Sequence, residues 1–137
     1  MSKPFTHRLR VRYSEIDGQK FVFNANYAVY VDICNTEYFR MLLGDEWVKK
    51  PDFEPVLAKL TIEYKRPAKL DDILDITCRV IKIGRTSWVT HYEIWRGEEL
   101  MTTAETVQVC IDLETETAQP LPKNVREKMI EFEKITE

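Results

Sequence analysis

One carboxylate stands where it could do chemistry. Asp17 lies in a loop between a strand-like segment and a long apolar segment of helical period, seven residues before Asn24. A carboxylate can act as a general base or as a nucleophile. The first N–H groups of a helix lack intrahelical partners, and with the helix dipole they stabilise an oxygen that gains negative charge. Asp17 and the helix start would together suit attack on a carbonyl group, but a loop aspartate also caps turns or helices, so spacing alone leaves both interpretations open.

The other acidic, histidine, serine and cysteine side chains show no pattern of a second catalytic or metal site. Glu15 is expected to be a solvated residue at a strand end, and Glu37, beside the apolar helix face, a buried and hydrogen-bonded structural acid. The two histidines, His7 and His91, lie within strand-like alternation, and no serine stands in a nucleophile-elbow motif. Because there is no H-x-x-x-H or C-x-x-C spacing, the sequence predicts no metal site.

The composition describes one ordinary globular domain over residues 1–137. Hydrophobic residues make up 44% and charged residues 31%, which argues against disorder, and a net charge of −3 with dispersed Lys and Arg gives no nucleic-acid surface. The cysteines, Cys34, Cys78 and Cys110, are widely spaced and odd in number, as expected of small buried residues in a reducing compartment. No apolar signal segment is present, and no run approaches the roughly 18 apolar residues of a membrane helix. We therefore expect a cytoplasmic protein without a membrane span.

The elements that must position Asp17 follow from hydrophobic periodicity. Residues 5–13 alternate between apolar and polar side chains, which predicts a half-buried strand. Residues 25–43 have a helical period, with Asn24 or Asn26 as the expected N-cap and Gly44 as the C-cap. The apolar helix face is predicted to hold Tyr27, Tyr30, Val31, Cys34, Tyr38, Met41 and Leu42, and the opposite stripe Asp32, Asn35, Thr36 and Arg40.

The rest of the chain is strand-like until a short C-terminal helix. Alternating segments and tight turns predict four further strands, at about residues 55–66, 73–83, 86–95 and 100–113. Residues 121–135 are typical of a short helix opened by Pro122. Consecutive strands with tight turns form an antiparallel sheet, and only the long helix has enough apolar surface to cover it. The predicted fold is α+β: an antiparallel sheet of about five strands wrapped around one long central helix, with a short C-terminal helix.

Two blocks of this sequence resemble a known family. The segment YSEIDGQKFVFNANYAVYVDICNTEYFR, residues 13–40, resembles the signature of hotdog-fold acyl-CoA thioesterases of the 4-hydroxybenzoyl-CoA thioesterase type. The residues in register with that signature are Tyr13, Glu15, Asp17, Val22, Phe23, Asn24, Asn26 and Tyr27, followed by TEYFR. IEYKRPAKLDDILDITCRVIKIGRTS, residues 62–87, resembles the strand pair and turn that follow in the same family. The resemblance covers nearly the whole chain in unbroken order and implies the hotdog fold.

The resemblance also implies an activity, which is hydrolysis of an acyl-CoA thioester to the free acid and coenzyme A. Asp17 would be the catalytic carboxylate, and Asn24 and Tyr27 would form the helix-start site for the carbonyl oxygen. The implied substrate-binding residues are Phe23, Asn26 and, near the nucleotide of coenzyme A, Arg85. No cofactor is expected, since coenzyme A is part of the substrate. A homodimer, or a tetramer built as a dimer of dimers, is implied by the family and also by the unpaired sheet edge.

Several alternatives stay open to the sequence. A non-catalytic hotdog domain could bind an acyl group or another small hydrophobic ligand without an ionised Asp17. A hotdog dehydratase is less well supported, because no His and Asp are paired for proton removal and return, and an acyl-responsive transcription regulator lacks a preceding DNA-binding segment. Aromatic and aliphatic acyl groups, coenzyme A and carrier-protein thiols, and nucleophilic and general-base roles for Asp17 are all compatible with the pattern.

Overall fold

The computed structural model describes residues 3–51 and 53–135. The elements, in chain order, are β1 (Phe5–Arg10), the 3-10 turn η1 (Tyr13–Glu15), α1 (Asn26–Leu43), α2 (Asp45–Lys49), β2 (Glu54–Tyr64), β3 (Ile73–Ile83), β4 (Ser87–Arg96), β5 (Glu99–Asp112), β6 (Thr117–Ala118) and α3 (Lys123–Glu133). This order confirms the predicted strand, long helix, four strands and short helix. The short elements η1, α2 and β6 are additional to the prediction.

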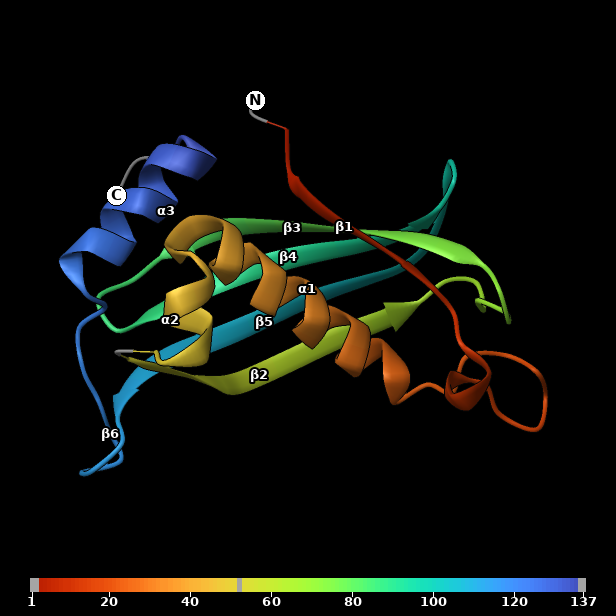
Figure 1. Cartoon of the computed structure of the whole chain (residues 1–137), viewed down its shortest axis with the longest axis horizontal. Helices are drawn as coiled ribbons and strands as arrows, with labels where there is room; N and C mark the ends of the chain where they lie inside the picture. The colour runs from red at the N-terminus through yellow and green to blue at the C-terminus, as the bar shows by residue number, and fades with distance from the viewer. Residues whose placement is uncertain (1–2, 52, 136–137) are drawn as a thin grey trace.

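The five long strands form one antiparallel sheet in the order β1-β3-β4-β5-β2, and β6 pairs with the end of β5. Figure 1 shows α1 lying across one face of this sheet, with α3 near one end and the loop before α1 at the other. The expected α+β architecture, an antiparallel sheet around one long helix, is confirmed. β2 forms one edge of the sheet.

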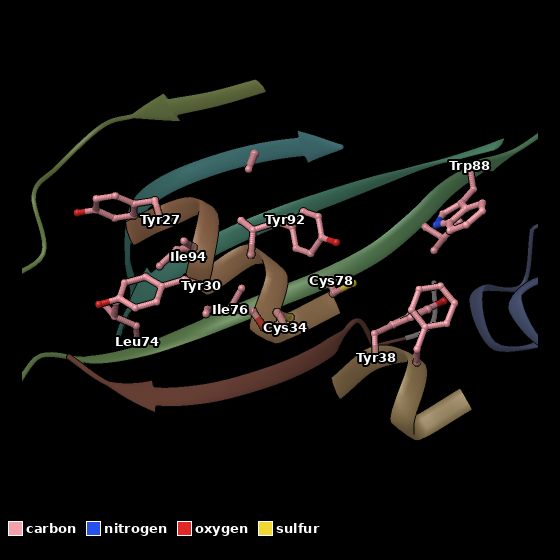
Figure 2. Packing of buried hydrophobic residues seen from close by; sticks show 14 of the residues in the cluster. Tyr27, Tyr30, Cys34, Tyr38, Leu74, Ile76, Cys78, Trp88, Tyr92 and Ile94 are labelled. Atoms are coloured by element: carbon pink, nitrogen blue, oxygen red, sulfur yellow. Dashed lines mark hydrogen bonds between the residues drawn. The ribbon is translucent and has the colours of Figure 1, made fainter. Parts of the chain in front are cut away.

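The core lies between α1 and the sheet, and large aromatic side chains fill much of it (Figure 2). Tyr30 and Tyr38 from α1 and Trp88 and Tyr92 from β4 are each almost completely buried. Burying apolar area of this size is the main favourable term in folding such a domain. The three cysteines are free and buried within this core, as the sequence predicts.

The first strand is shorter than predicted. β1 ends at Arg10, because the Val11 N–H donates to the carbonyl of Asp72 at 2.9 Å and the Arg12 N–H to the carboxylate of Glu15 at 2.9 Å. These bonds turn the chain into η1. Tyr13, placed by the alternation on the buried face, is consequently 80% exposed.

The long helix agrees with the prediction in its length but not in its N-cap. Ala25 is the N-cap and makes no side-chain capping bond, so the expectation of Asn24 or Asn26 is wrong. The Asn26 amide instead donates to the carbonyl of Glu15 at 2.8 Å. Gly44 is the C-cap, with a φ of +93° that favours glycine.

Two side chains of α1 differ from the prediction in their burial. Asn35, expected on the polar stripe, is buried, because its Oδ1 accepts a hydrogen bond from the Tyr92 hydroxyl at 3.2 Å. Met41, expected on the apolar face, is 40% exposed. Buried polar groups are normally hydrogen-bonded, and a helical period does not reveal a partner on a distant strand.

Candidate active site

The Asp17 loop closes on itself between η1 and α1. The Asp17 N–H donates to the Phe21 carbonyl at 2.8 Å, and Asp17 Oδ1 accepts the N–H groups of Gln19 at 2.8 Å and Phe21 at 3.3 Å. Lys20 closes the loop with a φ of +69°, in the left-handed region. One carboxylate oxygen therefore caps a turn, as the structural alternative predicts. The other, Oδ2, has no hydrogen-bond partner among the residues that the structure describes.

Asp17 also lines a pocket of about 270 Å³ at the start of α1. The pocket lies between the loop before α1 and the segment where β2 ends. Its other lining residues are Gln19, Phe21, Val22, Asn24, Tyr27, Tyr64, Lys65, Arg66 and Pro67. The structure thus brings together Asp17, Asn24 and Tyr27, the three residues predicted to be catalytic.

The helix start offers free backbone donors one step before its first helical residue. The N–H groups of Asn26, Tyr27 and Ala28 donate to carbonyls three residues back, at 2.8, 3.3 and 3.2 Å. Those of Asn24 and Ala25 have no partner within residues 3–51 and 53–135. Asn24 lines the pocket, so its unpaired N–H is the candidate backbone donor at the helix start.

Tyr27 brings a neutral phenol to the pocket. Its side chain is buried, and its oxygen accepts the Ala68 N–H at 3.1 Å. Burial raises the pKa of the Tyr27 phenol above its usual value, so the proton stays on the oxygen at neutral pH. The ring of Tyr64 packs edge-on against that of Tyr27 at 5.3 Å, and the Tyr64 hydroxyl donates to the Asn24 carbonyl at 3.1 Å. These contacts fix the helix start.

Glu15 is a buried hydrogen-bond centre beneath the loop, and the prediction of a solvated strand-end residue is wrong. Its Oε1 accepts the Arg12 N–H at 2.9 Å and the Tyr30 hydroxyl at 2.8 Å, and its Oε2 pairs with the Arg12 guanidinium at 2.6 Å. Burial alone would raise the pKa of the Glu15 carboxyl, but the bonds from Arg12 and Tyr30 together lower it. The Glu15 carbonyl also accepts the Phe23 N–H and the Asn26 amide. Glu15 therefore ties together both ends of the Asp17 loop.

The three predicted substrate-binding residues do not line this pocket. Phe23 is 49% exposed and stands in the sequence between Val22 and Asn24, which do line the pocket. The Asn26 side-chain amide donates to the Glu15 carbonyl. Arg85 lies in the β3–β4 turn, at the α3 end of the sheet (Figure 1), where its carbonyl accepts the Leu121 N–H at 3.1 Å. Within one chain the structure therefore does not bring Arg85 to Asp17.

Glu37, expected to be a buried structural acid, is only half-buried. It makes an ion pair with Arg40, one turn further along α1, at 3.1 Å. Since residues three apart on a helix are neighbours, this is a local surface pair.

Three residues at the end of β2, which were not among the predicted site residues, also line the pocket. Tyr64 supports the helix start, and the exposed Lys65 and Arg66 stand at the pocket. Lys65 lies 3.7 Å from Glu63, and Arg66 pairs with Glu99 at 2.9 Å. In the sequence, YKRPAK offers cations of the kind that the phosphates of coenzyme A favour, although such residues usually only solvate a surface. Its place beside the helix start depends on the pairing of β2 with β5.

Within residues 3–51 and 53–135, no group of three or more His, Cys, Asp or Glu side chains is arranged to hold a metal ion. None of the helices in the described part of the chain combines the length and the hydropathy needed to cross a membrane.

Residues 19–103 match the family model of the thioesterase superfamily. The chain belongs to this superfamily. Among curated thioesterases, it is 30% identical to the acyl-CoA thioester hydrolase YbgC of Escherichia coli over 123 residues, which cover 88% of this chain and 92% of YbgC. It is 27% identical to the long-chain acyl-CoA thioesterase FadM of Escherichia coli over 124 residues, 89% of this chain and 94% of FadM.

Solved structures of other proteins share the fold. A Thermus thermophilus thioesterase in complex with coenzyme A and zinc is 25% identical, with a TM-score of 0.84 over 96% of this chain and 95% of the other. A hypothetical protein from Aquifex aeolicus superposes with a TM-score of 0.85 over 92% of this chain and 99% of the other, at 24% identity. The hotdog fold and the prediction of a thioester hydrolase are therefore confirmed.

Proposed function

We propose that this superfamily member hydrolyses acyl-CoA thioesters, with Asp17 as the catalytic carboxylate and the start of α1 as the oxyanion site. One observation carries the proposal: Asp17, which has an unpaired carboxylate oxygen, and Asn24, which has an unpaired backbone N–H, line the same pocket. The names of relatives such as YbgC and FadM support the substrate class.

In this mechanism the thioester carbonyl oxygen lies at the free N–H of Asn24, near the positive end of the helix dipole. Asp17 Oδ2 either takes a proton from a water that attacks the carbonyl carbon, or attacks that carbon itself and forms a mixed anhydride that water then opens. In both routes the C–S bond breaks, the thiolate leaves and takes up a proton, and the acid is released. The neutral Tyr27 hydroxyl is a second donor to the developing oxyanion.

The cations at the pocket suit the phosphates of coenzyme A. Lys65 and Arg66 are both exposed there, and their existing partners, Glu63 and Glu99, are surface acids that phosphate can replace. Arg85 would contact the nucleotide only if a second subunit brought it to the pocket. Phe23 remains a proposed contact at the entrance. Asn26 is better assigned as a positioning residue, because its amide holds the Glu15 carbonyl.

We also propose a homodimer, or a dimer of dimers, with its sites at the subunit interface. The outer edge of β2 has no strand partner among the described residues, and native proteins cover or pair such edges. Exposed apolar side chains continue this edge: Leu57 and Tyr64 on β2 and Val29 on α1. Light scattering is expected to give at least a dimer. A chain that is monomeric at micromolar concentration and fully active would contradict the proposal.

The three free cysteines of the protein favour a reducing location such as the cytoplasm.

A thiol-release assay over acyl-CoAs of varied length and aromaticity tests the activity, with acyl-carrier-protein thioesters as a second panel. The non-catalytic alternative is favoured by one observation, the use of Asp17 Oδ1 to cap a turn. If acyl-CoA binds but no thiol is released from any substrate, that alternative is correct.

A further inference from the structure

A second cavity, of about 70 Å³, lies between α1 and the sheet. It is lined by Ala28, Val31, Asp32, Asn35, Leu57, Leu60, Tyr92, Thr106 and Gln108. Tyr92 extends from β4 beneath α1, as Figure 2 shows. A cavity of about 150 Å³ can bind benzene, so this cavity has about half that room. The cavity therefore fits the end of a chain rather than a whole ligand.

The floor of this cavity is polar, although it lies in the core. The Trp88 indole donates to Gln108 Oε1 at 3.1 Å, and because an indole is only a donor, this bond identifies the oxygen and leaves Gln108 Nε2 free. Asn35 Oδ1 accepts the Tyr92 hydroxyl, which leaves Asn35 Nδ2 free. Neither amide nitrogen has a hydrogen-bond partner among the described residues, and neither is fully sealed from solvent.

Thr106 adds a buried hydroxyl that is also unpaired. The residue is 4% exposed, and its Oγ1 has no hydrogen-bond partner in the described part of the chain. Burial raises the pKa of the Tyr92 phenol, which therefore keeps its proton and donates it to Asn35 Oδ1. A buried polar group without a partner costs free energy, so a ligand that pairs with it is favoured.

The rim of the cavity restricts the chemistry of that ligand. Asp32 is exposed there and offers a carboxylate, which only accepts hydrogen bonds. A ligand carboxylate would be repelled by Asp32, and a methyl end would displace water from the amide donors without replacing its hydrogen bonds. A hydroxyl group can accept from Asn35 and Gln108 and donate to Asp32. Of these three end groups, it alone satisfies both sides of the cavity.

The cavity follows the reaction pocket along one face of α1. Asn24 and Tyr27 line the pocket, and Ala28 and Val31, each four residues further on, line the cavity. From Tyr27 to Asn35 the helix rises about 12 Å, at about 1.5 Å per residue. A zigzag chain of about ten carbon atoms, with bonds of about 1.5 Å, spans that distance.

We propose that this cavity is an end-group subsite, which selects medium-length acyl chains with a hydroxyl about ten carbon atoms from the thioester. The inference rests on the proposed function, because it takes the acyl group to start at the Asp17 pocket. It adds a specificity that the Asp17 site does not determine.

The test compares 10-hydroxydecanoyl-CoA with decanoyl-CoA as substrates of the full-length protein. The wild type is expected to favour the hydroxylated substrate about tenfold in kcat/KM, as one net hydrogen bond allows. Thr106→Val removes the unpaired hydroxyl at nearly constant shape and is expected to lower this preference several-fold.

Thr90→Val is the matched control. Thr90 lies opposite Thr106 in the β4–β5 register, and its Oγ1 is likewise buried without a partner among the described residues, but it does not line the cavity. This variant is expected to keep the wild-type preference. Equal or better turnover of decanoyl-CoA by the wild type would overturn the inference, and so would a preference that Thr106→Val leaves unchanged.

Calorimetric binding of the same two thioesters separates the two proposals. If no thiol is released but 10-hydroxydecanoyl-CoA binds about tenfold more tightly, the subsite stands and hydrolysis is wrong. If thiol is released without any preference, hydrolysis stands and the subsite is wrong.

Discussion

The two halves of α1 each carry a tyrosine that donates to a buried glutamate. In the N-terminal half, Tyr30 donates to Glu15 at 2.8 Å, and in the C-terminal half Tyr38 donates to Glu133 at 2.6 Å. Burial raises the pKa of both phenols, and the glutamates raise it further, so both stay protonated. The same pair of side chain types therefore occurs twice along one helix.

The surroundings of the two glutamates differ. Glu15 is paired with a cation, Arg12, and both of its oxygens are used beneath a loop that borders an open pocket. Glu133 ends α3, and its Oε2 also accepts the Val80 N–H at 3.0 Å, while its Oε1 is buried with no partner among the described residues. The first pair shapes a loop that carries chemistry. The second fastens the C-terminal helix to the core.

The largest expected effect lies at the open end. Asp17→Asn should lower kcat by about 10²- to 10⁴-fold, the usual contribution of a positioned base. The fold should persist, because the amide oxygen can still accept from Gln19 and Phe21. Steady-state thiol release with urea unfolding measures both. Near-wild-type turnover in a folded Asp17→Asn protein would remove Asp17 from the mechanism.

At the closed end the effect should fall on stability instead. Glu133→Ala leaves the Tyr38 hydroxyl and the Val80 N–H buried without an acceptor, at a cost of about 3 kcal/mol in the free energy of unfolding. Turnover per folded molecule should stay within about twofold, since the site is at the other end of the helix. Glu133→Gln is the control, because it keeps an acceptor and should lose less. An unchanged urea midpoint in Glu133→Ala would show that α3 is not fastened by this residue.

The charge on Glu15 should appear in the pH dependence of stability. Its pKa is lowered in the folded protein, so it stabilises the fold above the unfolded value of about 4.5, and this contribution is lost as pH falls through the folded pKa. Hydrogen bonds to a charged group contribute about 1.5–3 kcal/mol, which Glu15→Gln should largely lose at pH 7. Unfolding free energies of the two proteins should therefore converge on acidification. Parallel curves from pH 7 down to the acid transition would contradict the charged assignment.

The smallest difference should separate the two tyrosines. Tyr38→Phe should cost about 1 kcal/mol more than Tyr30→Phe, because among the described residues Glu133 keeps only the Val80 N–H as a donor, while Glu15 keeps Arg12. Paired thermal and urea unfolding can resolve this. If Tyr30→Phe were the more costly change, the loop beneath the pocket would depend more on its tyrosine than on Arg12.

Local patterns were enough for the elements and for the placing of Asp17. The helical period, with Gly44 after it, gave α1 within one residue, and alternation gave the five long strands, because side-chain spacing and caps act over a few residues. The short distance in sequence from Asp17 to Asn24 was likewise enough to bring both to one pocket. Resemblance to the thioesterases then supplied the roles that spacing alone left open.

Contacts between distant segments decided the rest. Asn35 is buried because it accepts a hydrogen bond from Tyr92 on β4, which is 57 positions away in the sequence. Glu133 is buried because α3 packs beside α1, where Tyr38, 95 positions earlier, donates to it. Lys65 and Arg66 became pocket residues only when β2 ended beside the start of α1, whereas Arg85 was carried to the far end of the sheet. The periodicity of a single segment does not predict contacts between segments that are distant in the sequence. They follow from the strand order and from the burial of polar groups whose partners only the folded chain supplies.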